Sequence, residues 1–574
     1  MRVLPRFVLP TLLGGAALWA LVAVQAAKPP GLASLFPAGA PIYVEAKDFH
    51  GLLRQWDNSP EKRTWLSSDS YADFSRSRLL SRLAEAQGQF SAAAGIPADV
   101  NLLETVAGKE SALAIYDVGS LSFVYLTRMD QPSAETTPLW LIRGRFEQRN
   151  EAGSVFFVRQ DPESRRVAAF AVQDGWLILG TREDLVAGVL DRLHHEATQD
   201  LAGEAWFAGA VQQAAEPSGD LRMLLNLGKL VAMRPFDSYW VQQNDGELKQ
   251  YSAAVSDLYC EAPAWREQRT MLREPQPNPR PPGTDVSSLA ALAPAGTTFW
   301  SARAAPSTLS LLTMLRDDLL DPQPSSTSGM AYAPPLATAE SAGASSDLET
   351  RIDRSPALAT QSDPWRTLRE MLVAAQPSGV LSVYEAGPAP TGIFIPIHHA
   401  VVVASARDWN MVEVQEALTA ALHSRLAVSQ LGIGWVTRSG PEGGFEALDG
   451  QITLLAAARN DKLFLANDAA MLSSLLANAG KTATEDAGVT YAAVFNHSDD
   501  EQATFRNLFG LLDRAGSRGS ADGAGDVQRG EPPAFFSGNL ASLSRVFSAV
   551  SQVRMEERDQ GAKVSESVRY LWKR

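Results

Sequence analysis

Cysteine is almost absent from this chain of 574 residues, which contains only Cys260. A single thiol cannot form an internal disulfide, and it cannot supply the thiolates of a Cys-rich zinc or iron–sulfur site. Histidine is scarce as well, with seven residues, and the sequence has no His-Glu-x-x-His motif. The sequence therefore gives no local signature of a metal centre, and we expect neither a metal nor an organic cofactor.

Positive charge is also in short supply. The 51 Lys and Arg residues are outnumbered by 65 Asp and Glu residues, which gives a net charge of −14. Because nucleic-acid phosphates require a basic surface, this balance argues against a nucleic-acid partner. The hydrophobic fraction of 45% and the charged fraction of 20% are ordinary for globular domains, and the length allows two or three of them.

Long apolar runs are lacking except at the N-terminus, where residues 7–24 follow Arg2 and Arg6. At about 1.5 Å per residue such a helix spans roughly 27 Å, close to the hydrocarbon thickness of a bilayer. Small residues around 24–26 also resemble a signal-peptidase site. Residues 1–27 are thus predicted to be a signal peptide or a membrane anchor. The rest of the chain is expected in the periplasm, tethered to the inner membrane through residues 7–24 or secreted after cleavage.

The clearest local pattern lies in residues 165–193. Two apolar runs, 167–172 and 176–179, flank Asp174-Gly175, a dipeptide typical of a two-residue β-hairpin turn. Thr181 is predicted to cap the helix that follows, because apolar residues then recur at helical spacing up to Leu193. This segment therefore predicts a hairpin that leads into an amphipathic helix.

The same pattern returns in residues 452–476, with Asn460-Asp461 as the turn and Asn467 as the predicted cap. Two further similarities keep the same order: residues 35–39 resemble 292–296, and residues 248–257 resemble 543–552. We interpret them as a duplicated domain. The predicted fold is α+β, with two similar lobes behind an N-terminal apolar helix, each lobe a mostly antiparallel sheet with packed helices.

Composition sets the predicted domain boundaries. Residues 35–273 form the first α+β repeat, in which residues 139–147 are predicted to be a strand. Residues 274–283 contain five prolines and are predicted to be a stiff linker. Residues 288–574 form the second repeat, with a disordered insertion at 321–363 and a mobile Gly-rich loop at 515–533.

Catalytic candidates are few. Asp48 and His50 resemble a base and its orienting partner, and His399 is a third candidate, but no nucleophile accompanies them. Ser59 and Lys62 have the Ser-x-x-Lys spacing of some serine enzymes, yet Ser before Pro is also an ordinary helix start. These residues support only an alternative hypothesis, a periplasmic hydrolase whose site is assembled from residues distant in sequence.

Aromatic pairs precede the last matching segment of each repeat: Tyr239-Trp240 in the first and Phe535-Phe536 in the second. A recurring aromatic pair is a candidate lining for a ligand or partner groove, and core packing is the alternative interpretation.

Several segments of the first repeat also resemble a known class of proteins. They are Leu-Phe-Pro-Ala-Gly at 35–39, Ile-Tyr-Val-Glu-Ala-Lys-Asp at 42–48, Ser-Arg-Ser-Arg-Leu-Leu at 75–80, residues 108–116 and residues 175–185. Together they resemble large exported bacterial envelope proteins of unknown function with a duplicated domain. The resemblance implies export and transfers no catalytic residue. We therefore expect a non-catalytic exported module that binds or scaffolds an envelope protein or another envelope component.

Overall fold

The computed structural model describes residues 31–59, 62–63, 66, 78–194, 199–215, 217–233, 249–261, 264–275, 280–320, 363–386, 397–426, 434–449, 453–481, 488–496 and 550–572. The predicted leader at 7–24 and the predicted loop at 515–533 lie outside these ranges, as does the predicted insertion except for Asp363. Within the ranges, no helix combines the length and the apolar character needed to cross a membrane.

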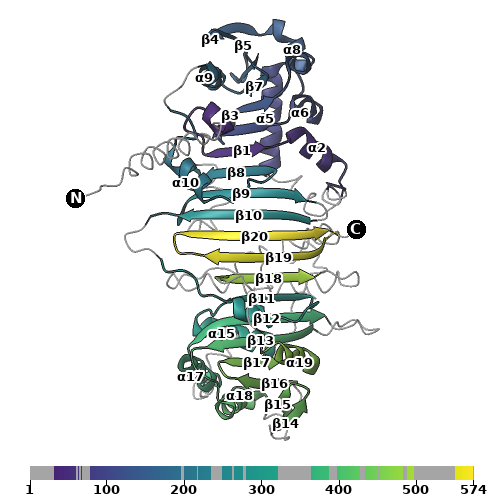
Figure 1. Cartoon of the computed structure of the whole chain (residues 1–574), viewed down its shortest axis with the longest axis vertical. Coiled ribbons are helices and arrows are strands. Elements are labelled where there is room, and N and C mark those ends of the chain that lie inside the picture. Colours follow the sequence, from purple (N-terminus) through teal and green to yellow (C-terminus); the bar gives the residue numbers. More distant parts are fainter. Residues whose placement is uncertain are drawn as a thin grey trace, which may run out of the picture. The chain divides into compact units, whose positions relative to one another are not determined.

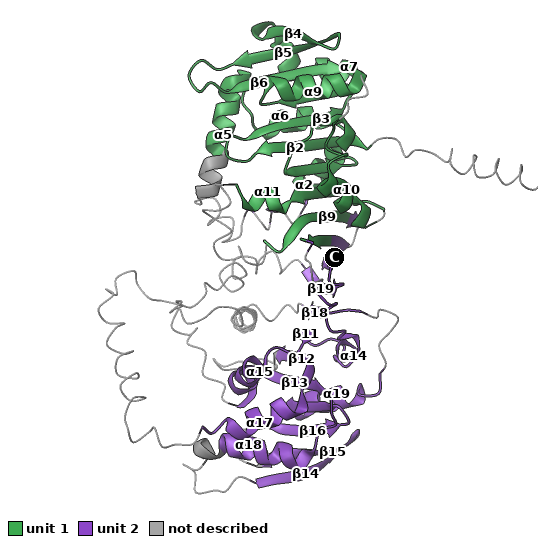
Figure 2. Cartoon of the chain, turned by 90° about the vertical axis from the view of Figure 1, so that its left-hand side faces the viewer, with its two compact units in different colours: residues 1–57, 78–259, 269–274 green, residues 58–77, 260–268, 275–574 purple. Residues whose placement is uncertain are grey.

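The chain divides into two compact units (Figure 2). Unit 1 comprises residues 1–57, 78–259 and 269–274, and unit 2 comprises residues 58–77, 260–268 and 275–574. The predicted repeats at 35–273 and 288–574 resemble this division, but their status as repeats stays a prediction.

Unit 1 is built around antiparallel strands (Figure 1). The strands are β1 (Ile42–Ala46), β2 (Ser111–Asp117), β3 (Ser122–Arg128), β4 (Glu147–Glu151), β5 (Ser154–Gln160), β6 (Val167–Gln173), β7 (Trp176–Gly180), β8 (Leu221–Asn226), β9 (Tyr251–Glu261) and β10 (Ala264–Arg273), the last two shared with unit 2. The helices are η1 (Leu32–Leu35), α2 (Phe49–Asp57), α5 (Arg78–Ala94), α6 (Val100–Val106), α7 (Gln131–Glu135), α8 (Pro138–Leu141), η2 (Arg143–Arg145), α9 (Glu183–His194), α10 (Ala205–Gln213) and α11 (Leu227–Val231).

Unit 2 has a similar inventory. Its strands are β11 (Phe299–Ala304), β12 (Pro377–Ala386), β13 (Ile397–Ser405), β14 (Gly434–Gly440), β15 (Gly443–Asp449), β16 (Leu455–Arg459), β17 (Lys462–Ala466), β18 (Tyr491–Asn496), β19 (Val550–Asp559) and β20 (Lys563–Trp572). Its helices are α14 (Ser287–Ala290), α15 (Thr308–Leu315), η3 (Arg316–Leu320), α17 (Arg366–Ala375), α18 (Met411–Leu426) and α19 (Ala469–Ala477).

The strands of each unit are paired in the same succession. In unit 1 the order is β4-β5-β6-β7-β3-β2-β1-β8-β9, and every one of these pairs is antiparallel. In unit 2 the order is β14-β15-β16-β17-β13-β12-β11-β18-β19, again antiparallel throughout. A duplicated domain would produce this pattern.

The prediction of two lobes that each contain their own sheet is nevertheless wrong. All the strands in the described ranges belong to one antiparallel sheet of 20 strands. The physical reason is that the edge strand of any sheet leaves unpaired backbone N–H and C=O groups that another strand can cover. Hydrophobic alternation along a strand records which faces are buried and carries no information about what pairs with the edge.

Residues 139–147 also differ from the predicted strand. Thr137 accepts a hydrogen bond from the Trp140 amide and begins the short helix α8, and η2 follows it. Pro138 stands at the start of this helix, where its fixed φ angle and missing N–H do no harm. The strand begins only at Glu147.

Each face of the unit 1 strands carries a hydrophobic cluster, because successive strand residues point to opposite sides. One cluster joins Tyr43 of β1 and Val124 of β3 to the buried face of α9. The other joins Tyr125 of β3 and Leu177 of β7 to α5 and α6. In unit 2 one cluster packs against α14 and α19, and the other against α15, α17 and α18.

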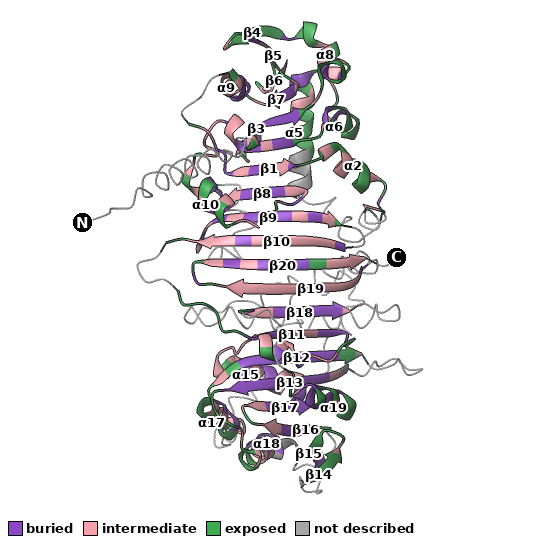
Figure 3. Cartoon of the chain, viewed as in Figure 1, coloured by how far each residue is buried: buried purple, intermediate pink, exposed green. Residues whose placement is uncertain are grey.

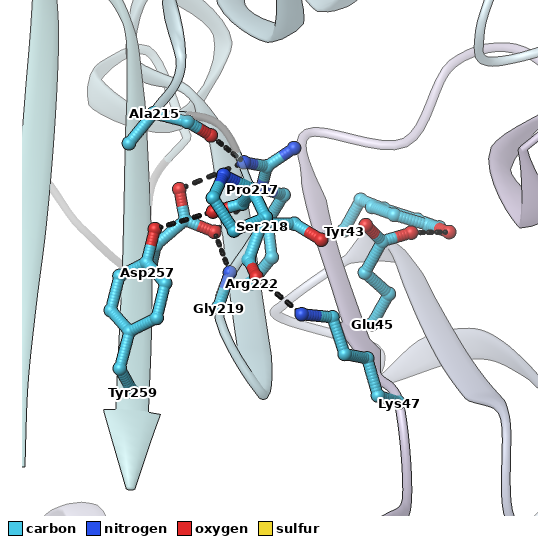
Figure 4. Close-up of polar contacts among 10 residues, drawn as sticks. All are labelled: Tyr43, Glu45, Lys47, Ala215, Pro217, Ser218, Gly219, Arg222, Asp257 and Tyr259. Carbon is cyan, nitrogen blue, oxygen red and sulfur yellow. Dashed lines mark hydrogen bonds and ion pairs between the residues drawn. The ribbon is translucent and has the colours of Figure 1, made fainter. Parts of the chain in front are cut away.

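A buried ion pair links β8 to β9 in unit 1 (Figure 4). Arg222 donates from Nε to one oxygen of Asp257 at 2.7 Å and from Nη2 to the other at 3.0 Å. Asp257 also accepts from the Gly219 amide at 2.9 Å, and Arg222 Nη2 donates to the carbonyl of Ala215 at 2.7 Å. The pair is buried within unit 1 and fully engaged, which identifies it as structural.

Candidate functional site: an apolar pocket in unit 1

A pocket of about 590 Å³ lies between the strands of unit 1 and the helices α2, α5 and α6. This volume falls within the range of roughly 300–1,000 Å³ that is typical of small-molecule sites. Its lining consists of Val44, Ala46, Phe49, Gln87, Phe90, Ala98, Asp99, Val100, Leu102, Leu103, Val106, Ser111, Ala112, Leu113, Ile115, Leu121, Phe123, Tyr125, Leu179 and Leu221. Most of these side chains are aliphatic or aromatic, so the pocket is chemically suited to an apolar ligand.

Strand alternation supplies the floor of the pocket. Val44 on β1 lies directly opposite Leu113 on β2, and both line the pocket. Their neighbours Tyr43 and Ala114 point to the other face and are buried in the cluster against α9. Because the side-chain period of a strand is two, the same short strands supply both a closed core and the floor of an open pocket.

The wall between α5 and α6 is fixed by hydrogen bonds. Gln87 of α5 donates to the carbonyl of Ala98 at 2.6 Å, and the Ala98 amide donates to Ser91 Oγ at 2.9 Å. Asp99 then caps α6 by accepting from the Leu102 amide at 3.0 Å. These contacts hold the connection between the two helices against the rim of the pocket.

Hydroxyl groups at the inner end of the pocket are already engaged. Ser111 Oγ lies 2.6 Å from Thr127 Oγ1, and Tyr125 donates from its hydroxyl to the carbonyl of Val106 at 3.1 Å. Burial raises the pKa of the Tyr125 hydroxyl above its ordinary value, so it stays neutral. A ligand would therefore meet polar groups whose hydrogen bonds are already made. A polar substituent on the ligand would gain little binding free energy from them.

Beside the pocket, α2 buries none of its residues (Figure 3). Phe49, Leu52, Leu53 and Trp56 recur at helical spacing along α2, the pattern of a core-facing helix, yet all remain partly or largely exposed. In unit 2 the helix after the corresponding first strand is α15, which buries four side chains. These are Leu311, Leu312, Met314 and Leu315.

The rim of the pocket carries two exposed aliphatic side chains from α6. Val100 is 59% exposed and Leu103 is 39% exposed, and both line the pocket. Exposed aliphatic residues that continue into a pocket are informative, whereas scattered single ones are ordinary. The apolar character therefore extends from the interior to the entrance.

Asp48 and His50, the candidate base and orienting partner of the alternative hypothesis, lie at the start of α2. Asp48 accepts a hydrogen bond from the Gly51 amide at 2.9 Å, so its carboxylate serves the first turn of α2. His50 is exposed on the same helix. Within the described ranges, neither side chain hydrogen-bonds to a serine, threonine or cysteine. Ser59 likewise accepts from the Lys62 amide at 3.0 Å, the kind of hydrogen bond that a helix-capping serine makes.

His399, the third candidate, belongs to unit 2 and is 3% exposed. Its ring stacks on Tyr384 with centroids 4.1 Å apart, and its Nδ1 lies 3.3 Å from the carbonyl oxygen of Asp318. Burial lowers the pKa of this imidazole, and the neighbouring Asp318 opposes that shift. Its Nε2 is buried and makes no hydrogen bond to the part of the chain that the structure describes.

His399 and Phe123 hold matching positions in the two units. The Phe123 amide donates to Thr181 Oγ1 at 2.9 Å, and the His399 amide donates to Asn467 Oδ1 at 2.7 Å. Phe123 pairs across the strands with Ile115, as His399 pairs with Tyr384. Unit 2 thus has a buried polar pair where unit 1 has two residues that line the apolar pocket.

A Ser-His-Asp grouping that sequence analysis missed occurs at the end of α9. Ser154 Oγ lies 2.7 Å from His194 Nε2, and Asp174 Oδ2 lies 3.7 Å from the same nitrogen. In a catalytic triad, the serine and the carboxylate engage opposite nitrogens of the imidazole. Here they share one nitrogen, so this grouping lacks the geometry of a triad.

The aromatic pairs Tyr239-Trp240 and Phe535-Phe536, proposed as a groove, lie outside the described residues. Within the described part of the chain, no cluster of three or more His, Cys, Asp or Glu side chains is placed to hold a metal ion.

Comparisons with known proteins add little to this geometry. No protein-family model and no curated protein matches the chain. Among solved structures, crystal form I of TP0453 aligns with a TM-score of 0.23 and 7% identity, over 44% of this chain and 82% of that one. Crystal form III aligns with a TM-score of 0.24 and 8% identity, over 43% and 81%. Similarity at this level establishes neither a shared fold nor a shared function.

Proposed function

We propose that this protein is a non-catalytic module of the cell envelope that acts by binding, and that unit 1 holds an apolar envelope component in its pocket. The observation that carries the proposal is a cavity of about 590 Å³ with an almost wholly apolar lining. Apolar surface gains about 25 cal/mol per Å² when it leaves water, whereas a polar ligand would lose its hydration without gaining new partners.

The N-terminal sequence supports an envelope setting. Arg2 and Arg6 precede the apolar residues 7–24, an arrangement typical of a signal peptide or an anchor with its N-terminus in the cytoplasm. An exported protein meets membrane lipids and other apolar envelope components, so the chemistry of the pocket and the proposed location agree.

The proposal is tested by the binding of Nile red, a neutral dye that becomes fluorescent in apolar surroundings, to the purified protein. The test variant is Val44→Trp, which places a large ring on the floor of the pocket. Its matched control is Met223→Trp. Met223 lies directly opposite Val44 on β8 and on the same face, but it does not line the pocket.

We expect the wild-type chain and Met223→Trp to bind the dye alike, and Val44→Trp to bind at least about tenfold more weakly, or about 1.4 kcal/mol. Thermal unfolding of both variants should stay close to wild type, because the new ring in Val44→Trp enters existing space. Absence of dye binding to the wild-type protein, or equal binding by Val44→Trp, would contradict the proposal.

A further inference from the structure

The described lining of the unit 1 pocket carries a single charged side chain, and that charge is negative. Among the described residues that line the pocket, Asp99 is the one side chain that is ionised near neutral pH. It is exposed, and it lies beside the exposed Val100 at the start of α6. The hydrogen bond from the Leu102 amide lowers the pKa of Asp99, so its negative charge persists in mildly acidic solution.

The guanidinium groups of Arg159 and Arg166 make their hydrogen bonds outside the pocket lining. Arg159 donates to the carbonyl oxygens of Ala92 and Ala93 at the end of α5, at 2.6 and 2.7 Å. Arg166 donates to Gln89 at 2.8 Å and to the carbonyl of Ser120. Neither guanidinium lines the pocket. Within the described lining, a negatively charged group beside Asp99 would therefore meet no cation to offset the repulsion.

Among the described lining residues, Gln87 is the other side chain at this end with a strongly polar group. Its amide nitrogen already donates to Ala98. Glu85 on α5 and Glu104 on α6 are exposed and add negative charge nearby. Arg54 on α2 is exposed and is not part of the lining. The entrance thus combines an apolar path with a fixed negative charge.

We propose that the pocket takes the acyl chain of a single-chain amphiphile whose headgroup carries no net negative charge, and that Asp99 sets this preference. The inference rests on the proposed function, since it names the ligand class of the same pocket. The acyl chain lies on the floor of the pocket formed by the strands, and the headgroup stays in water beside Asp99.

The size of the preference follows from Coulomb's law. Two like charges roughly 6 Å apart repel by about 0.7 kcal/mol in bulk water and by about twice that at half the dielectric constant. An anionic amphiphile should therefore bind about threefold to tenfold more weakly than a neutral one with the same chain. Added salt should narrow the difference, because it screens exposed charges.

The test uses two amphiphiles with the same oleoyl chain, monoolein and oleate, as competitors of Nile red at pH 8 and at concentrations below their aggregation. Wild-type protein should release the dye at about threefold to tenfold lower monoolein than oleate. The test variant is Asp99→Asn, which removes the charge and keeps a residue that caps helices equally well. Its control is Glu104→Gln, which removes one exposed charge from the same helix outside the lining.

We expect Asp99→Asn to bring the two affinities together and Glu104→Gln to keep them apart. Thermal unfolding shows whether each variant stays folded. If neither amphiphile displaces the dye, the proposed function fails and this inference fails with it. If both bind wild-type protein equally, only the inference on headgroup charge is overturned. If the preference exists and survives in Asp99→Asn, the assignment of Asp99 is overturned.

Discussion

Removing the carboxylate of Asp257 is expected to destabilise unit 1 severely. Asp257 is 0% exposed and Arg222 is 5% exposed. In Asp257→Ala, the Arg222 guanidinium loses its hydrogen bonds of 2.7 and 3.0 Å to the carboxylate, and its positive charge remains buried. The Gly219 amide loses its acceptor as well. A buried charge without its partner costs about 3–5 kcal/mol.

The expected loss translates into a large thermal shift. A unit of 150–250 residues loses roughly 2–4 °C of melting temperature for each kcal/mol, so Asp257→Ala should lower the transition of unit 1 by roughly 6–20 °C. Differential scanning calorimetry would follow the two units together, and hydrogen exchange of β8 and β9 would assign the shifted transition to unit 1.

An exposed ion pair of the same kind provides the control. Arg128 donates from Nε to Glu110 at 3.2 Å, and the two side chains are 54% and 55% exposed. Glu110→Ala should cost only about 0–1 kcal/mol, because water solvates the arginine that remains. If Asp257→Ala and Glu110→Ala proved equally mild, the reasoning from burial would be refuted.

A double variant separates the lost interaction from the charge left behind. Arg222→Met combined with Asp257→Leu removes both charges and keeps apolar volume in the site. Replacing a whole buried pair in this way is often neutral or even stabilising, whereas removing one partner is not. We therefore expect the double variant to be more stable than Asp257→Ala, and the opposite result would show that packing rather than charge dominates.

Two further predictions concern a close backbone contact and a buried imidazole. A Cβ added at Gly108 would lie 2.3 Å from the carbonyl oxygen of Arg128, whereas one at Gly88 within α5 would meet nothing within 4 Å. Gly108→Ala should therefore lower the urea midpoint of unit 1 while Gly88→Ala raises stability by about 0.5–1 kcal/mol, and equal effects would contradict the contact. In unit 2, burial lowers the pKa of His399 below the ordinary 6.5 of the unfolded chain. As the pH falls, the unfolded state then binds the proton before the folded state does. The free energy of unfolding should therefore keep its full value above pH 6.5, and it should decrease as the pH drops from 6.5 to below the pKa of His399 in the folded state. His399→Phe should flatten this dependence in urea titrations from pH 8 to 5; a pH dependence that persists in His399→Phe would assign it to other groups.

Local signals in the sequence were sufficient for the hairpin–helix segments. The runs predicted at 167–172 and 176–179 are confirmed as β6 and β7, and the predicted turn is present with φ angles of +52° at Asp174 and +76° at Gly175. The second segment behaves in the same way, with φ of +53° at Asn460. A two-residue turn and the residues flanking it interact within a few positions of each other, so the sequence determines them directly.

The predicted helix caps show where local reasoning fails. Thr181 and Asn467 stand in the right place and have suitable side chains, yet Asp468 caps α19 by accepting from the Met471 amide at 2.8 Å. Thr181 and Asn467 instead accept from the amides of Phe123 and His399, 58 and 68 residues away. An oxygen that is able to cap a helix accepts equally well from a strand, and only the tertiary arrangement decides which donor it meets.

The candidate site depends still more on tertiary structure. The sequence determined the alternation that puts Val44 and Leu113 on one face of their strands, and it determined the amphipathic stripe of α2. It did not determine that this stripe stays partly exposed, whereas α15 in unit 2 buries four side chains. Alternation fixes which side chains share a face, because the backbone sets that geometry within each strand. Whether a helix closes over that face depends on long-range packing, and that packing leaves the pocket open in unit 1.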